Sequence, residues 1–263
     1  MDFFNDLTVS DQDFQRLVQF MQKNYGIDLS KKKTLITSRL SHSLKERGYT
    51  SLEPFLERLF SRRDPEDVEL ILNKLTTNYT YFLREPDHFT YFQNVILPEL
   101  EKRHQKDRVL SIWSAGCSSG EEPYTLSIYL KEYFGSKAAQ WDTRVLATDI
   151  SQQAMAKATA GLYHVPADMP NDWLRRYFTF DKSTGLYSVG PAIRKNVIFR
   201  PFNLMDPIQF RLKFDVIFCR NVMIYFNQET RDGLVKRFYD AMYPNGYLFV
   251  SHSESLGQDP KFR

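Results

Sequence analysis

Apolar residues near the start of the chain recur every three or four positions, with polar residues between them. One such stripe contains Phe14, Leu17 and Met21, and this spacing predicts amphipathic helices whose apolar faces pack together. Three further stripes follow, and the second helix of the series is expected to end at Gly48, a residue type that commonly closes helices. We therefore predict a small all-α domain over residues 1–75.

From residue 108 onward, short apolar runs alternate with helical stripes. The runs cover residues 109–113, 144–149, 197–200, 214–219 and 246–250. Apolar strands separated by helices predict a mainly parallel, doubly wound sheet that is covered on both faces and binds ligands at the carboxyl ends of its strands. Residues 176–200 carry a hairpin pattern, for which we expect a small antiparallel β insertion. The predicted fold class is therefore α/β, with a small all-α N-terminal domain in front of the sheet domain.

A polar and aromatic segment, residues 76–88, separates the two patterns. It contains Pro86, which we expect to end any helix that reaches it. We interpret this segment as a linker that carries functional residues, because the helical stripe is interrupted here. The sheet domain then extends over residues 89–263.

The composition is that of an ordinary globular protein, and the local distribution of charge is more informative. Hydrophobic residues make up 42% and charged residues 25% of the 263 positions, and the formal net charge is +3. The second predicted helix is basic and contains one acid, Glu46. Its cations are Lys31, Lys32, Lys33, Arg39, Lys45 and Arg47. Such a face predicts an acidic partner (a nucleic acid, a membrane surface or an acidic protein), and the alternative is a face that is simply solvated.

Cysteine usage and apolar runs bear on the compartment. Two cysteines, Cys117 and Cys219, are too few for a disulfide framework in a chain of this length. The N-terminus lacks the basic and apolar regions of a secretory signal, and no apolar run approaches the roughly 20 residues of a membrane-spanning helix. We therefore expect a cytoplasmic protein with reduced thiols. The five histidines are scattered and no cluster has metal-ligand spacing, so we expect no metal.

A loop of small residues, 114–120, follows the first predicted strand, where a nucleotide-like cofactor sits in such sheets. Gly116 allows the backbone to approach a ligand closely, although a purely structural turn is the alternative. Glu121 and Glu122 stand where a phosphate would favour a lysine. The loop therefore argues against a triphosphate and for a cofactor with positive character and hydroxyl groups.

Asp149 ends the second predicted strand, where an acid is placed to accept hydrogen bonds from ribose hydroxyls. The alternative is that it caps the following helix, although Ser151 is also available for that position. Loop and acid together fit either a nicotinamide dinucleotide or S-adenosylmethionine. A dehydrogenase would also need a glycine-rich pyrophosphate turn and a histidine or lysine acid, and the sequence shows neither pattern.

Five segments, which include this loop and this acid, favour the second cofactor. They are residues 76–84, 113–124, 147–150, 219–226 and 251–254. On these segments, in the family's order and over almost the whole chain, the sequence resembles the CheR family, the chemotaxis receptor glutamate O-methyltransferases. The resemblance implies a Rossmann-like class I methyltransferase domain that binds S-adenosylmethionine and releases S-adenosylhomocysteine, and a helical N-terminal domain that recognises the substrate. The family usually continues into a last strand beyond the position of Arg263.

The resemblance also assigns residues to the site. The expected cofactor-binding residues are Asn78, Thr80, Arg84, Gly116, Glu122, Asp149, Asn203, Leu204, Arg220 and Asn221. At the reacting centre, Arg84 is expected to orient a carboxylate of the substrate or cofactor, and Tyr225 to shape the methyl pocket. The alternative for Arg84 is a structural ion pair with Glu85 or Glu122. Because a glutamate side chain is ionised at pH 7, methyl transfer needs positioning and desolvation but neither a general base nor a metal.

The resemblance implies a partner for the basic helix, because the methylation regions of chemoreceptors are acidic helical bundles. The expected docking residues are Lys32, Lys33, Arg39 and Arg47. We expect no nucleic-acid partner, and contact with the membrane only through the receptor. The β insertion resembles a subdomain with which some family members hold a peptide at the receptor C-terminus. Because Phe180 and Ser188 stand where those members have arginines, we expect no dependence on that tether.

Two rival functions share the same fold. A small-molecule methyltransferase would not need the basic N-terminal domain. A signalling module that binds the cofactor without catalysis would not need Arg84, Asn221 and Tyr225, so their presence favours an enzyme.

Overall fold

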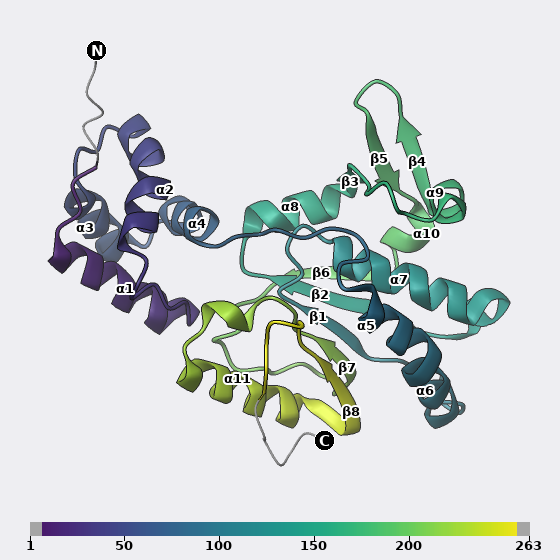
Figure 1. Cartoon of the computed structure of the whole chain (residues 1–263). Coiled ribbons are helices and arrows are strands. Elements are labelled where there is room, and N and C mark those ends of the chain that lie inside the picture. Colours follow the sequence, from purple (N-terminus) through teal and green to yellow (C-terminus); the bar gives the residue numbers. More distant parts are fainter. Residues whose placement is uncertain (1–6, 257–263) are drawn as a thin grey trace. The chain divides into compact units, whose positions relative to one another are not determined.

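The computed structural model describes residues 7–256 (Figure 1). The chain forms two compact units, each of which is described by itself. The first comprises the chain up to Asn78 together with Tyr225–Thr230, and the second comprises Tyr79–Ile224 together with the chain from Arg231 onward. The expectations about a secretory signal at residues 1–6 and about the family's last strand concern residues outside the described range.

The first unit is helical, as the stripes predict. Its helices are α1 (Asp11–Tyr25), α2 (Lys33–Glu46), α3 (Leu52–Arg62) and α4 (Pro65–Leu75). The Ser10 hydroxyl accepts the backbone N–H of Asp13 at 3.0 Å and caps α1. Gly48, with φ at 81°, follows the end of α2, and its N–H donates to the carbonyl of Lys45 at 2.8 Å. Most residues of the apolar stripes are buried and form the core of this unit.

The second unit contains a five-stranded parallel sheet. Its strands are β1 (Ile112–Ala115), β2 (Val145–Asp149), β6 (Val197–Pro201), β7 (Phe214–Phe218) and β8 (Met242–Phe249). Their order is β6-β2-β1-β7-β8, and every neighbouring pair is parallel. The chain first builds outward from β1 through β2 to β6 and then resumes on the other side with β7. The carboxyl ends of all five strands therefore share one edge, and the order reverses next to β1, where ligands bind in such sheets.

Helices cover both faces of this sheet. Those wholly or mostly in the second unit are α5 (Pro86–Tyr91), η1 (Phe92–Ile96), α6 (Leu97–Arg103), α7 (Glu121–Phe134), η2 (Gly135–Gln140), α8 (Gln152–Ala160), α9 (Asn171–Tyr177), α10 (Pro191–Arg194), η3 (Met223–Tyr225) and α11 (Gln228–Ala241). Phe89 of α5 and Leu126 of α7 pack on one face, in the same cluster as Ile112 of β1. On the opposite face, Trp113 contacts Phe238 of α11 with ring centroids 5.4 Å apart. The predicted fold class is confirmed.

Pro86 begins α5, whereas we expected it to end a helix. It occupies the first turn, where its missing N–H has no intrahelical partner to lose and its fixed φ suits the helix. The linker therefore ends in a helix start, and residues 86–103 form one continuous helical stretch of α5, η1 and α6.

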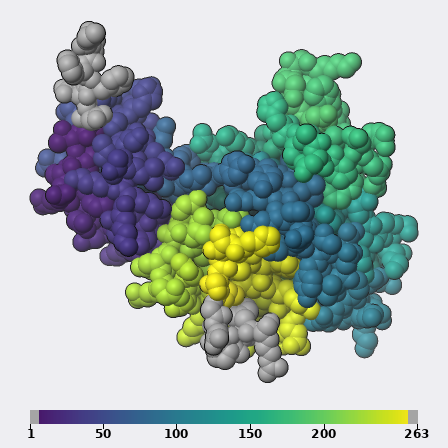
Figure 2. Space-filling view, in the orientation of Figure 1, coloured from purple at the N-terminus to yellow at the C-terminus, as the bar shows by residue number. Residues whose placement is uncertain are grey.

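A small antiparallel sheet is formed by β3 (Leu162–Tyr163), β5 (Leu186–Val189) and β4 (Phe178–Asp181), in that order. The hairpin of β4 and β5 stands out from the second unit (Figure 1 and Figure 2). The expected insertion, 176–200, is wrong at its end, because Val197–Pro201 is strand β6 of the parallel sheet. The buried side chain of Val197 pairs in register with Val145 of β2, and that packing places the strand. No helix within residues 7–256 is long and apolar enough to cross a membrane.

Candidate active site

The loop after β1 turns tightly across the end of β2. The backbone N–H groups of Gly116 and Cys117 both donate to the carbonyl of Thr148, at 2.8 and 2.9 Å. Gly116 and Gly120 have φ of 82° and 97°, and a Cβ at Gly120 would lie 2.8 Å from the Cβ of Ala158. The glycines are thus required by the backbone and by close packing against the protein, which is the structural part of their role.

Asp149, at the carboxyl end of β2, is buried beside this loop. Its Oδ2 accepts the N–H of Ser118 at 2.7 Å and its Oδ1 accepts the N–H of Ser151 at 2.9 Å. The hydroxyl of Ser151 accepts the N–H of Ala154 at 3.0 Å and caps α8. Ser151 therefore fills the capping role that was the alternative for Asp149, and the acid is held at the sheet edge where ribose binds in this class of fold.

A buried arginine joins the other elements of the sheet edge. The side chain of Arg220, which follows β7, is only 2% exposed. Its Nη1 donates to Glu122 Oε2 at 2.9 Å, and its Nη2 donates to Glu85 Oε2 at 3.1 Å and to the carbonyl of Arg84. Ser114 of β1 donates to the other oxygen of Glu122 at 2.7 Å. This arginine network therefore ties the ends of β1 and β7, the start of α7 and the linker together.

The network also sets the ionisation of its acids. Burial alone would raise the pKa of Glu85, but the adjacent Arg220 guanidinium outweighs burial and holds that pKa below its usual range. Glu85 is consequently ionised at neutral pH. The thiols behave differently, because complete burial raises the pKa of Cys117 and of Cys219 well above the usual value, as expected for packing residues.

Arg84 is held by aromatic rings and backbone, and the acids beside it pair with Arg220. Its Nη1 donates to the carbonyl of Tyr79 at 2.7 Å, and its guanidinium lies 5.7 and 6.0 Å from the ring centroids of Tyr79 and Tyr81. Leu83 and Glu85, on either side, have φ of 63° and 57°. Non-glycine residues in this region cost about 1–3 kcal/mol each and cluster at functional sites.

The turns after β6 and β7 hold three more expected residues. The side-chain oxygen of Asn203 accepts the N–H of Met205 at 3.0 Å, and Leu204 is buried. Asn221, with φ at 59°, donates its N–H to Glu254 Oε2 at 3.0 Å. Sequence reasoning gave Glu254 no role, although it lies in one of the resembling segments.

The last three expected site residues, Asn78, Thr80 and Tyr225, are divided between the two units. Asn78 and Tyr225 belong to the first unit, whereas Thr80, half-buried, belongs to the second. The Tyr225 hydroxyl donates to the carbonyl of Thr77 at 3.3 Å, and Lys32 Nζ lies 5.6 Å from the Tyr225 ring centroid. Tyr225 and the start of the linker are therefore held together within the first unit.

The remaining expected docking cations also have partners inside the first unit. Lys33 pairs with Asp11 at 2.6 Å, and both side chains are exposed. Arg39 donates to backbone carbonyls at the end of α4 and to the Thr77 hydroxyl, at 3.3 to 3.5 Å. Arg47 pairs at 2.7 Å with Asp67, which is completely buried. Arg58 also pairs with Asp67, at 2.8 Å, so two partly exposed arginines share the charge of the buried carboxylate.

The residues at the sheet edge fit S-adenosylmethionine. Asp149 lies at the sheet edge, where an acid can accept hydrogen bonds from ribose hydroxyls. Acids follow the loop where phosphate binders carry a lysine, and the guanidinium of Arg84 can pair with a carboxylate. The donor set is that of a cofactor with hydroxyls, a carboxylate and positive character. It is unsuited to a polyphosphate.

Comparison with known proteins supplies the family. The family model for the CheR methyltransferase SAM-binding domain matches residues 78–263, and the model for the CheR methyltransferase all-alpha domain matches residues 12–76. The chain belongs to the CheR methyltransferase family. The predicted resemblance is confirmed, and the dehydrogenase alternative is dropped.

Curated CheR-family relatives match almost the whole chain. The chemotaxis protein methyltransferase of Borreliella burgdorferi is 38% identical over 261 residues, which cover 95% of this chain and 90% of the relative. Chemotaxis protein methyltransferase 1 of Pseudomonas aeruginosa is 36% identical over 260 residues, covering 97% and 94%. The chemotaxis protein methyltransferase of Escherichia coli is 34% identical over 257 residues, which cover 95% of this chain and 86% of the relative. This CheR methyltransferase therefore contains an S-adenosylmethionine-binding domain and the family's all-α domain.

Proposed function

We propose that this chain transfers the methyl group of S-adenosylmethionine to glutamate side chains in the cytoplasmic region of chemoreceptors and forms glutamate methyl esters. The charge of Arg84 carries the proposal. Within residues 7–256, no carboxylate forms an ion pair with Arg84, and the neighbouring Glu85 and Glu122 pair with Arg220. A cation held in place by its own backbone and two rings is available to a carboxylate of the substrate or cofactor.

The chemistry assigns simple tasks to the residues of the chain. S-adenosylmethionine, when bound, supplies an electrophilic methyl group on a sulfonium. The glutamate substrate is ionised at pH 7, so no residue has to remove a proton. Arg84 orients the carboxylate, Tyr225 shapes the space around the methyl group, and exclusion of water strips the attacking oxygen of its hydration. Arg84 acts by orientation, because a tight cation clamp on the attacking oxygen would lower its nucleophilicity.

The cofactor-binding residues divide by role in this proposal. Asp149 accepts from the ribose hydroxyls, and the turns with Asn203, Leu204 and Asn221 surround the adenosine and close the site. Asn78 and Thr80 reach the cofactor from the linker, and Gly116 lets the loop approach it. Glu122 and Arg220 hold this arrangement, since both oxygens of Glu122 and both terminal nitrogens of Arg220 bond to other parts of the protein.

Docking of the receptor is proposed at the first unit. The exposed pair of Lys33 with Asp11 is worth little in water, so a carboxylate of an acidic receptor helix can replace Asp11. Lys32 and Arg39 lie on the same helix and its cap and complete this surface. Arg47, whose side chain is 34% exposed, also belongs to this proposed surface, because Arg58 keeps Asp67 paired when Arg47 turns to a receptor carboxylate.

We also propose that no C-terminal receptor tether is needed. Phe180 is exposed on β4, and Ser188 lies on the central strand β5, where it pairs with Thr179 and Leu162. Neither side chain offers a cation to a peptide carboxylate. Removal of the receptor tail is expected to leave the methylation rate unchanged, and loss of methylation would contradict this proposal.

The function is tested by incubating the protein with radiolabelled S-adenosylmethionine and chemoreceptor-bearing membranes. We expect label on the receptor that leaves as methanol in alkali, the behaviour of a carboxyl methyl ester. The matched controls are Arg84→Ala, expected to lose transfer, and Lys182→Ala in the exposed β4–β5 turn, expected to keep it. If no label reaches the receptor while calorimetry still shows cofactor binding, the enzyme proposal is contradicted and a cofactor-binding module is the better interpretation.

A further inference from the structure

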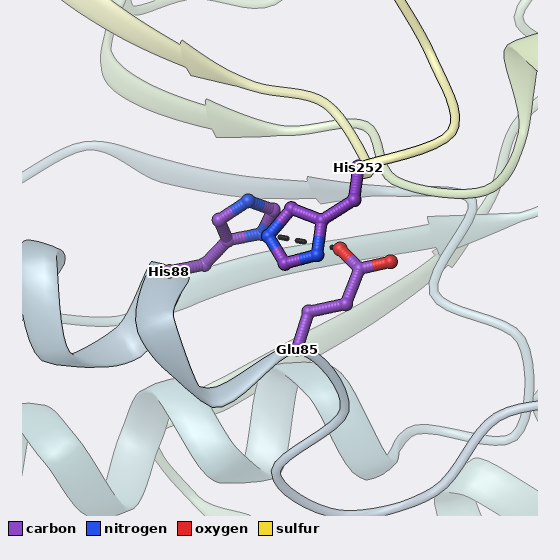
Figure 3. Close-up of side chains that lie close together, drawn as sticks. All are labelled: Glu85, His88 and His252. Atoms are coloured by element: carbon purple, nitrogen blue, oxygen red, sulfur yellow. Dashed lines mark ion pairs between the residues drawn. The ribbon is translucent and has the colours of Figure 1, made fainter.

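Three side chains outside the proposed methyl-transfer chemistry converge beside the arginine network (Figure 3). Glu85 is the N-cap residue of α5, His88 lies in the first turn of that helix, and His252 lies in the turn after β8. One donor atom of each lies within 4.8 Å of the others, and Glu85 Oε2 is 3.3 Å from His88 Nδ1. Figure 3 shows the carboxylate and the near edges of both imidazole rings directed toward one another.

The donor atom of His88 is not satisfied by the described part of the protein. His88 Nδ1 is buried and makes no hydrogen bond among the described residues, although Glu85 Oε2 is close. An imidazole nitrogen and a carboxylate oxygen that lie 3.3 Å apart without a hydrogen bond are both able to coordinate one cation placed between them.

The charge around the cluster favours a further cation. Arg220 carries one positive charge, whereas Glu85 and Glu122 carry two negative charges. Glu85 does share Oε2 with the guanidinium at 3.1 Å, which opposes a cation. A carboxylate has two oxygens with several lone pairs, so it can serve both, and Arg220 retains Glu122.

We propose that Glu85, His88 and His252 form a binding site for a divalent transition-metal ion of the Zn²⁺ type. Two imidazoles and one carboxylate are a zinc donor set with a fourth position left for water, whereas Ca²⁺ and Mg²⁺ prefer oxygen donors alone. With metal–ligand bonds of about 2.0–2.2 Å, the donors must approach to about 3.5 Å. His252 is exposed on a turn and is the residue that moves inward.

Such a site has a structural role. It joins the segment after β8 to the residue that follows Arg84, and methyl transfer itself uses no metal. This site is not recognisable from the sequence, because Glu85 and His88 are only a pair at the start of a helix and His252 comes from the other end of the chain.

The test uses the full chain without a histidine tag, stripped of metal by a chelator. Zn²⁺ is titrated in a calorimeter and Co²⁺ is followed by its visible absorption. We expect one saturable site and a rise in melting temperature on Zn²⁺ addition. His252→Ala or His252→Gln is expected to weaken binding at least about tenfold, because loss of even an outer-shell partner has that effect.

The matched control is His42→Ala, which removes another exposed histidine, 3.2 Å from Glu46, in the first unit. It is expected to leave affinity unchanged. The proposal is overturned if the wild type shows no saturable binding, or if both His252 variants bind Zn²⁺ as tightly as the wild type does. It is also overturned if His42→Ala loses as much affinity as the His252 variants. None of these readouts depends on methyl transfer, so the outcome is separate from that of the proposed function.

Discussion

Replacement of Arg220 by methionine removes the charge of the arginine network but keeps most of the apolar stem. The side chains of Glu85 and Glu122, 16% and 14% exposed, would each lose their ion-pair partner, and the carbonyl of Arg84 would lose a donor. Breaking a buried pair by removing one partner costs about 3–5 kcal/mol. Because both carboxylates keep slight access to water, we expect a loss of about 3 kcal/mol in the free energy of unfolding.

Urea unfolding followed by tryptophan fluorescence measures this loss in the second unit, which contains Arg220. All three tryptophans, Trp113, Trp141 and Trp173, belong to the second unit, so the signal reports its unfolding. The matched control is Arg144→Met, which breaks an ion pair with Asp142 whose side chains are 57% and 37% exposed. The control is expected to lose less than about 1 kcal/mol. An equally small loss for Arg220→Met would refute the reasoning about the network.

Three further predictions follow from contacts of the candidate site and the sheet. Replacement of Tyr79 and Tyr81 together by alanine is expected to lower kcat/KM about 5- to 30-fold, since two cation–π contacts of about 0.5–1 kcal/mol each orient Arg84. Replacement of both by phenylalanine keeps the rings and is expected to keep the activity. Unchanged activity of the alanine variant would contradict this role of the rings. Burial alone would lower the pKa of His104, but its bonds to Asp215 and Asp107 raise it above the usual value, with Arg103 4.0 Å from Asp215. The stability of the wild type over His104→Gln is therefore fully present below about pH 6.5 and declines as pH rises through the folded pKa, and urea unfolding at several pH values showing the opposite trend contradicts this. The KM for receptor is expected to rise with salt, since docking through exposed cations is screened, and a flat KM in steady-state assays argues against docking at α2.

The fold was predictable where local pattern and tertiary packing agree. Helical stripes and apolar runs set the helices of the first unit and the strands of the sheet, because burial of one face or of both faces leaves a period in the sequence. Residues 197–201 fit a hairpin partner or a parallel strand equally well by pattern, and the buried contact of Val197 with β2 makes the choice. Pro86 was misread because the same residue type ends one helix and begins the next.

The locations of site residues at strand ends were predictable, whereas the partners of the charged side chains were much less so. The location of Asp149 and of the Gly116 loop at the sheet edge was predictable because strand ends in parallel sheets meet at one edge. The pairing of Arg220 with Glu85 and Glu122 joins segments distant in sequence, and no spacing rule indicates it. A basic helix likewise shows how many cations it has, but not that one of them is already held by a buried acid.

The central claim is carboxyl methylation of glutamate on a receptor, and mapping the transferred group tests it most directly. The protein is incubated with chemoreceptor and S-adenosylmethionine carrying a deuterated methyl group, and receptor peptides are sequenced by tandem mass spectrometry. The prediction is that the label lies on glutamate side chains of the cytoplasmic helices, and that Arg84→Ala abolishes it. Label on lysine, on arginine or on a small molecule in place of receptor glutamate would contradict it.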